Sequence, residues 1–218
     1  MTEQPLVSVR GEAVRQVPPE LAVFSVTVSA RDKDRQATLA RLAERAAGLR
    51  RVLDEFADII ERRETGGVQV SPDLKRRGER VVAYHGSVST SVTVHDFATL
   101  GDLLLRLANQ EQTAVSGPWW RLRPGSTAGA EVRREAIAGA LSRAREYADA
   151  VGARIDRLVE IRDEGAGGDG GAQPRAMAFR GAAPEMDLSL ELDPQQQTVY
   201  AAVIVRVAIT EPTALTDG

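Results

Sequence analysis

Both histidines of the chain lie in one short stretch, VVAYHGSVSTSVTVHD, at residues 81–96. Histidine is the commonest metal ligand in proteins and the most frequent general acid or base near neutral pH. His85 and His95 would therefore mark a metal or catalytic site if the fold placed them together, or beside a buried carboxylate. The first question is therefore whether the fold brings the two histidines together or places either of them beside a buried carboxylate.

The stretch has the alternation of a β-strand, with valines on one face and polar residues on the other. His85 and His95 are ten residues apart, so at about 3.3 Å per residue they lie up to about 33 Å apart on one strand. Ligand nitrogens of a single metal ion lie about 2 Å from it, so the two cannot share a metal within this strand. We interpret the polar face as a solvated or interface surface; it carries His85, Ser87, Ser89, Ser91, Thr93 and His95.

Other motifs that carry chemistry are missing. The chain has no H-E-x-x-H, G-x-S-x-G or Walker-type motif, and no cysteine for disulfides, thiolate metal sites or nucleophilic catalysis. Weaker candidates are the glycine-rich residues 165–171, the basic turn at 75–80, and the adjacent carboxylates Asp54/Glu55 and Asp163/Glu164. We interpret these as a loop, a solvated turn and exposed pairs. The sequence thus predicts no catalytic residue, cofactor or metal.

Composition narrows the class of protein. At 218 residues and 43% hydrophobic, the chain can build one sizeable domain or two small ones. Its net charge of -3 gives no overall attraction to nucleic acid or anionic membranes. Apolar runs are shorter than the roughly 18 residues of a membrane span, and the amino terminus lacks the pattern of a signal peptide. We expect a soluble cytoplasmic protein with no membrane span and no nucleic-acid partner.

Hydrophobic periodicity predicts the elements. Strands are expected at residues 6–17 and 21–29, forming a hairpin around Pro18-Pro19, and at 68–74 and 81–94, forming a second hairpin. Later strands are expected at 113–123, 154–163 and 199–209. Helices are expected after Asp34, after Asp96, and at 128–151 before Gly152. The first has one apolar stripe, which fits packing on a sheet better than a coiled coil: Leu39, Leu42, Ala46, Leu49, Leu53, Phe56 and Ile60.

The resulting order is ββαββαβαββ. Because hairpins dominate and helices are interspersed, we predict an α+β fold with a largely antiparallel sheet and three main helices packed on one face. Residues 163–197 are rich in glycine and proline and low in apolar residues, which is typical of a flexible loop. We therefore expect a single domain over residues 1–218 with this loop inserted near its end.

The two tryptophans of the chain are adjacent. Strand alternation sends Trp119 and Trp120 to opposite faces of the sheet. One can join the core, while the other would be exposed or covered by a partner, because aromatic residues are enriched in interface cores. The alternative is that a covering helix or the long loop hides both.

Three segments together resemble the SIMPL-domain family, which includes periplasmic immunogenic and oxidative-stress defence proteins of bacteria and an animal protein that binds the interleukin-receptor-associated kinase. They are VSVRGEAVRQVPPELAVFSVTVSA, VVAYHGSVSTSVTVHDFATLGDLL and EVRREAIAGALSRAREYADAVGARIDRLVEI. The family's pattern is altered at Ala83 for a glycine, Val132 for an alanine and Arg143 for a lysine. The resemblance implies a fold without established enzymatic activity, assembly into large rings in some members, and roles in stress tolerance or protein contacts.

We therefore expect a non-enzymatic SIMPL-domain protein that forms a homo-oligomer and acts as a scaffold or stress-related binding module, with a protein partner as a further option. The candidate assembly or partner surface consists of His85, Ser87, Ser89, Trp119 and Trp120. The alternative is a small-ligand-binding protein or an unrecognised hydrolase with a pocket under the loop at 163–197. A third interpretation is an adaptor that docks through the turn at 75–80.

Overall fold

A computed structural model describes residues 4–74, 80–165 and 190–214. These residues form seven strands and three helices in the order ββαββαβαββ, as the sequence predicts. All strand pairs are antiparallel, so the α+β class and the antiparallel direction of the strands are confirmed. The strands are divided between two sheets, ordered β1-β7-β6 and β3-β4-β2-β5.

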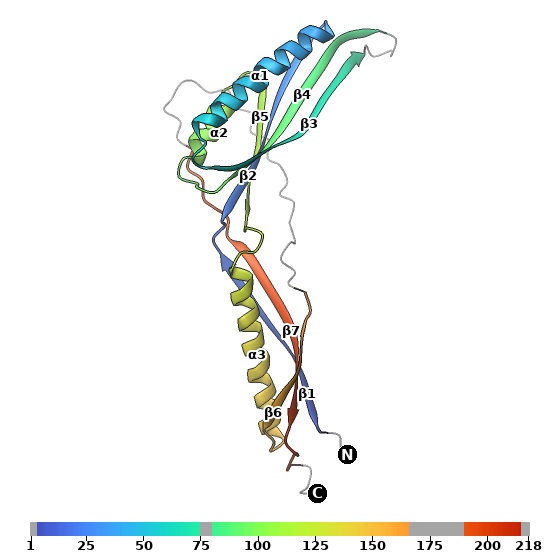
Figure 1. The fold of residues 1–218 in the computed structure, drawn as a ribbon, viewed down its shortest axis with the longest axis vertical. Helices are drawn as coiled ribbons and strands as arrows, with labels where there is room; N and C mark the ends of the chain where they lie inside the picture. The colour runs from blue at the N-terminus through green and yellow to red at the C-terminus, as the bar shows by residue number, and fades with distance from the viewer. Residues whose placement is uncertain (1–3, 75–79, 166–189, 215–218) are drawn as a thin grey trace. The chain divides into compact units, whose positions relative to one another are not determined.

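Each sheet belongs to its own compact unit (Figure 1). Unit 1 comprises Met1–Pro18, Arg123–Ala172 and Gln196–Gly218, and unit 2 comprises Pro19–Leu122 and Gln173–Gln195. Most of the predicted loop, residues 166–189, lies outside the described residues. The single-domain interpretation stays a prediction.

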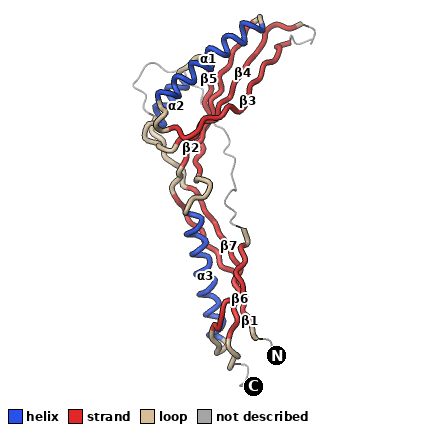
Figure 2. Tube along the Cα trace, in the orientation of Figure 1, coloured by secondary structure: helices blue, strands red, loops and turns tan. Residues whose placement is uncertain are grey.

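Unit 1 packs one helix against its three-stranded sheet (Figure 2). Its elements are β1 (Leu6–Val17), α3 (Ala128–Ala150), β6 (Ile155–Asp163) and β7 (Gln197–Ile209). Helix α3 packs mainly on β1 and β7. Its buried stripe is small, which brings the helix backbone close to the sheet: Val132, Ala136, Ala140, Ala144 and Ala148.

Gly11 on β1 lies where α3 approaches the sheet most tightly. A Cβ atom at this position would overlap the carbonyl oxygen of Ala136 and lie 2.7 Å from the Cβ of Ala140. At the end of α3, Gly152 has a φ of +71°, the left-handed conformation expected of a C-terminal stop. Only glycine fits the first position, and glycine is favoured at the second.

The predicted hairpin at residues 6–29 is wrong. Strand β1 pairs with β7, whereas β2 pairs with β4 and β5 in the other sheet. Tight hairpin turns need residues with positive φ, and the ring of proline fixes φ near -65°. Pro18-Pro19 therefore does not suit a two-residue hairpin turn between β1 and β2.

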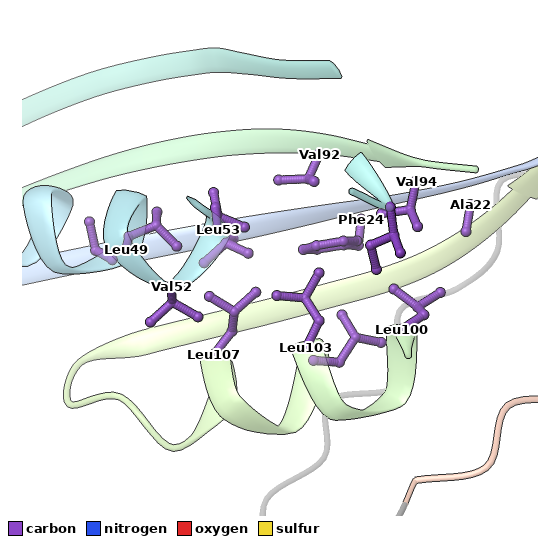
Figure 3. Packing of buried hydrophobic residues seen from close by; sticks show 14 of the residues in the cluster. Ala22, Phe24, Leu49, Val52, Leu53, Val92, Val94, Leu100, Leu103 and Leu107 are labelled. Atoms are coloured by element: carbon purple, nitrogen blue, oxygen red, sulfur yellow. The ribbon is translucent and has the colours of Figure 1, made fainter. Parts of the chain in front are cut away.

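Unit 2 packs two helices on one face of a four-stranded sheet (Figure 1). Its elements are β2 (Leu21–Asp32), α1 (Arg35–Glu55), β3 (Ile60–Leu74), β4 (Val81–Val94), α2 (Leu100–Ala108) and β5 (Thr113–Arg121). Figure 3 shows leucines of α2 directed toward Phe24 of β2 and Leu53 of α1. The core of unit 2 thus lies between α1, α2 and the apolar face of β2 and β4.

Helix α1 begins after Asp34 as predicted, and it ends at Glu55, before the last two residues of the predicted apolar stripe. The Asp34 carboxylate accepts the N–H of Ala37 at 2.8 Å, which is N-cap geometry. Leu42, Leu49 and Leu53 are buried against the sheet, which confirms packing on a sheet over a coiled coil. Leu39, at the start of the predicted stripe, is 43% exposed.

Two element boundaries differ from the prediction. Strand β3 begins at Ile60, and Gly66-Gly67 lies inside it at a shift of register, so the glycine pair forms a bulge and does not precede the strand. Helix α2 begins at Leu100 with Thr99 as its N-cap residue. Asp96, the predicted cap, instead accepts the N–H of Ala98 at 3.0 Å in the preceding turn.

Replacing Gly101 tests how closely residues 190–192 pack on α2. A Cβ atom on Gly101 would overlap the carbonyl oxygen of Leu190, and Leu192 packs against the core of unit 2. We expect Gly101→Ala to lower stability by about 1–3 kcal/mol and to increase amide exchange at residues 190–195. In the control Gly48→Ala, the new Cβ meets only atoms at ordinary contact distance. Unchanged exchange at 190–195 in Gly101→Ala would contradict this packing.

Candidate functional site

The face of the unit 2 sheet opposite α1 and α2 carries small hydroxyl side chains. Strand register places Ser25 beside Ser91 and Ser116, and Thr27 beside Ser89. No helix of the described ranges packs on this side of the sheet. We call it the polar face and define it as Ser25, Thr27, Ser29, Ser87, Ser89, Ser91, Thr93, Ser116 and Trp119. The predicted alternation along β4 is thus found in the structure.

Apart from Trp119, the side chains of the polar face are short and close together. The hydroxyls of Ser25 and Ser89 lie 3.1 Å apart across β2 and β4. Thr93 is only 5% exposed although no described helix covers it. Its neighbours in the sheet are Val23 and Arg62, and Val23 in turn pairs with Trp119. These side chains form one row across the four strands.

The two tryptophans lie on opposite faces, as predicted. Trp120 pairs with Ala22 on the core side, packs against the buried cluster and meets Phe97 edge to face, with ring centroids 4.9 Å apart. Trp119 pairs with Val23 on the polar face and is half-buried. Of the two, Trp120 therefore contributes to the core and Trp119 to the candidate surface.

Both histidines are exposed, and they lie at different positions on the sheet. His85 continues the row of polar residues on β4, where it pairs with Arg31 and Ser71. His95 follows β4, and its backbone N–H donates to the carbonyl of Ile59 at 3.0 Å. Within residues 4–74, 80–165 and 190–214, neither imidazole bonds a carboxylate, and no group of three or more His, Asp and Glu side chains could hold a metal.

The paired carboxylates considered in the sequence are engaged in surface contacts. Asp54 pairs with Arg63, and Glu55 pairs with Arg106, each at 2.5 Å. Glu164 accepts a hydrogen bond from Nε of Arg10 at 2.8 Å, which is the main cause that raises the pKa of that guanidinium. The glycines at 166–171 and the basic residues at 75–79 lie outside the described residues.

Asp32, at the end of β2, has a pKa below its usual range. The main cause is the hydrogen bond that its carboxylate accepts from the N–H of Asp34 at 3.0 Å, and an ion pair with Arg41 adds to it. Both contacts secure the turn into α1. We see a structural role for this carboxylate, since no basic or nucleophilic function follows from it.

A groove that the sequence did not predict lies between α1 and the β3–β4 hairpin. Its volume is about 310 Å³. It differs from the pocket expected under residues 163–197, because described residues of α1, β3 and β4 line it. Periodicity assigns the residues to elements, but it does not tell which strands a helix leaves uncovered.

A family model described as "SIMPL: Protein of unknown function (DUF541)" matches residues 7–207. The chain belongs to the SIMPL family. The match extends over both units, and it confirms the resemblance found in the three sequence segments.

Relatives of this SIMPL chain include two proteins named "26 kDa periplasmic immunogenic protein", from Brucella melitensis biotype 1 and Brucella abortus strain S19. Each is 30% identical over 189 residues, which cover 75% of this chain and 68% of the relative. Their name does not fit the cytoplasmic location expected from the amino terminus, which stays a prediction. No described helix has both the length and the apolar character needed to cross a membrane.

Proposed function

We propose that this SIMPL protein is a non-enzymatic, self-assembling scaffold or binding module whose polar face forms contacts between copies of the chain. The observation that carries the proposal is the composition of that face. Residues 25–29 on β2 and 87–93 on β4 place only Ser and Thr there, with the half-buried Trp119 at one side.

Unit 1 provides an internal comparison with a solvated sheet face. Its face opposite α3 carries interleaved charges, with ion pairs between Arg10 and Glu12 and between Arg206 and Glu160. Exposed strands commonly carry such charges, which discourage association. Strands β2 and β4 carry none on the polar face between residues 25–29 and 87–93, and the ion pair of Arg62 with Glu64 lies beside it on β3. Interface cores are depleted of charged residues. The contrast within one chain supports an interface on the polar face.

Short side chains also suit a contact between sheets. Ser and Thr lose little side-chain entropy when covered, compared with long charged side chains. Their hydroxyls can donate and accept, so they can pair with the same groups on a second copy. Trp119 would add a large apolar area at the edge of this contact, as aromatic residues do in interface cores.

The non-enzymatic part of the proposal rests on the residues available for chemistry. The carboxylates singled out in the sequence form exposed ion pairs or cap a turn. The matching family is described as being of unknown function. A link to stress response is implied only by the family resemblance, and it remains part of the proposal.

Replacing Trp119 tests the proposed contact. We expect Trp119→Ser to weaken association by about 2 kcal/mol, which is roughly thirtyfold in the dissociation constant. Light scattering of the full chain over a dilution series measures it. Tyr147→Ser is the matched control, because Tyr147 is 54% exposed on α3 in unit 1. Equal masses for wild type and Trp119→Ser at every concentration would contradict a role for this side chain.

A further inference from the structure

Helix α1 leaves part of one strand of its sheet uncovered. It packs on β2 and β4, while β3 forms the edge of the sheet beside it. Val68 of β3 is paired with Val88 of β4, so the two side chains lie on the same face of the sheet. Val68 is nevertheless 66% exposed. Val68 is therefore an exposed apolar side chain on the helix side of β3, whereas Val70 of the same strand packs against the core.

The groove lies along one side of α1, between the helix and strands β3 and β4. The helix contributes five residues spaced three and four apart: Ala46, Leu49, Arg50, Leu53 and Asp54. Val88 and Thr90 of β4 line it next to the helix, and residues 63–65 of β3 complete the lining. Its volume of about 310 Å³ is at the small end of the range for small-molecule sites.

The charges around the groove leave one cation without a counter-ion. Arg63 donates to Oδ1 of Asp54 at 2.5 Å and to the carbonyl of Leu53 at 2.6 Å. Glu64 pairs with Arg62 at 3.3 Å. In the described ranges, no carboxylate pairs with Arg50, the remaining charged residue of the lining. The groove thus combines Ala46 and Val88, above the buried Leu49 and Leu53, with polar side chains and a single available guanidinium.

We infer that this groove binds a medium-length acyl chain that carries a carboxylate. The alkyl part would lie against Ala46 and Val88, above the buried Leu49 and Leu53. The carboxylate would pair with Arg50, whose planar guanidinium suits bidentate contact. From Ala46 to Asp54 the helix rises about 12 Å, at about 1.5 Å per residue. An extended alkyl chain with C–C bonds of about 1.5 Å advances about 1.3 Å per bond, so about ten carbons span this length and eight carbons span about 9 Å of it.

Binding is measured on the full chain by equilibrium dialysis with octanoate, 1-octanol and acetate. We expect saturable octanoate binding with one site per chain, and weaker binding of acetate, which lacks the alkyl part. Arg50→Met should weaken octanoate about fivefold, the effect of losing one exposed ion pair, and leave 1-octanol within about twofold. The matched control is Arg51→Met, at the next position of the same helix.

A second pair of variants tests the position of the alkyl chain. Ala46 lines the groove, whereas Ala47 is exposed and does not. Ala46→Phe should therefore abolish binding of octanoate and 1-octanol, and Ala47→Phe should leave both unchanged. Any of three results would overturn the inference. These are no saturation at about millimolar octanoate, equal effects in both members of a pair of variants, and binding that appears only when an assembly is diluted. Light scattering reads the proposed assembly separately, so the two proposals can fail independently.

Discussion

Gly11→Val should lower the free energy of unfolding of unit 1 by at least about 3 kcal/mol, at the upper end of overpacking effects. The first atom of the new side chain would overlap the carbonyl oxygen of Ala136, which belongs to the helix backbone. A flexible side chain could move aside, but α3 can retreat only by losing the contacts of its alanine stripe. Unfolding in urea measures the loss, and hydrogen exchange should rise in β1, β7 and α3.

Gly139→Ala is the matched control for this substitution. Gly139 is an exposed position on α3, and nothing lies within 4 Å of an added Cβ. Because alanine favours helix over glycine, we expect a gain of up to about 1 kcal/mol. If Gly11→Val unfolded at the same urea concentration as the wild type, the close contact between β1 and α3 would be wrong.

Phe24→Ala should cost about 3–5 kcal/mol of the stability of unit 2. Phe24 is 0% exposed and lies in the cluster that joins β2 to both helices (Figure 3). Removal of its ring leaves a cavity between rigid elements, in addition to the lost burial of apolar surface. Urea unfolding checks the magnitude, and faster exchange should be confined to α1, α2, β2 and β4.

Val68→Ala serves as the comparison for Phe24→Ala. Val68 lies in the same sheet but is largely exposed, so its truncation should change stability by less than about 0.5 kcal/mol. Similar losses in the two variants would show that the cluster around Phe24 is not the core. Exchange that rises equally in both units would contradict their separate packing.

Local patterns predicted the elements of this fold well. The apolar stripe that includes Leu42 and Leu49 marks α1, Asp34 starts it, and Gly152 ends α3. Each of these signals depends on neighbouring residues and on backbone preferences that a short window contains. For the same reason, the alternation along β4 placed its polar face correctly.

Strand partners were harder to predict because they depend on distant residues. Val14 of β1 pairs with Tyr200 of β7. No residue near β1 in the sequence indicates that partner. Proximity in sequence favoured β2, and a hairpin was expected. The division into two sheets follows from this one pairing, so it could not be read from local patterns.

The candidate surface was only partly predictable. Alternation assigned Trp119 and Trp120 to opposite faces, but packing against Phe97 decided which of them joined the core. The groove beside α1 had no sequence signal. It arises because α1 packs on β2 and β4 and leaves part of β3 uncovered. Arg50 lines the groove only because the helix is placed in this way.

The central claim, self-assembly through the polar face, is tested most directly by the solution mass of the full chain. Light scattering across a dilution series should give a constant multiple of the 23.5 kDa chain mass down to about micromolar concentration. A mass of 23.5 kDa throughout that series would contradict the claim, and the polar face would then be a solvated surface.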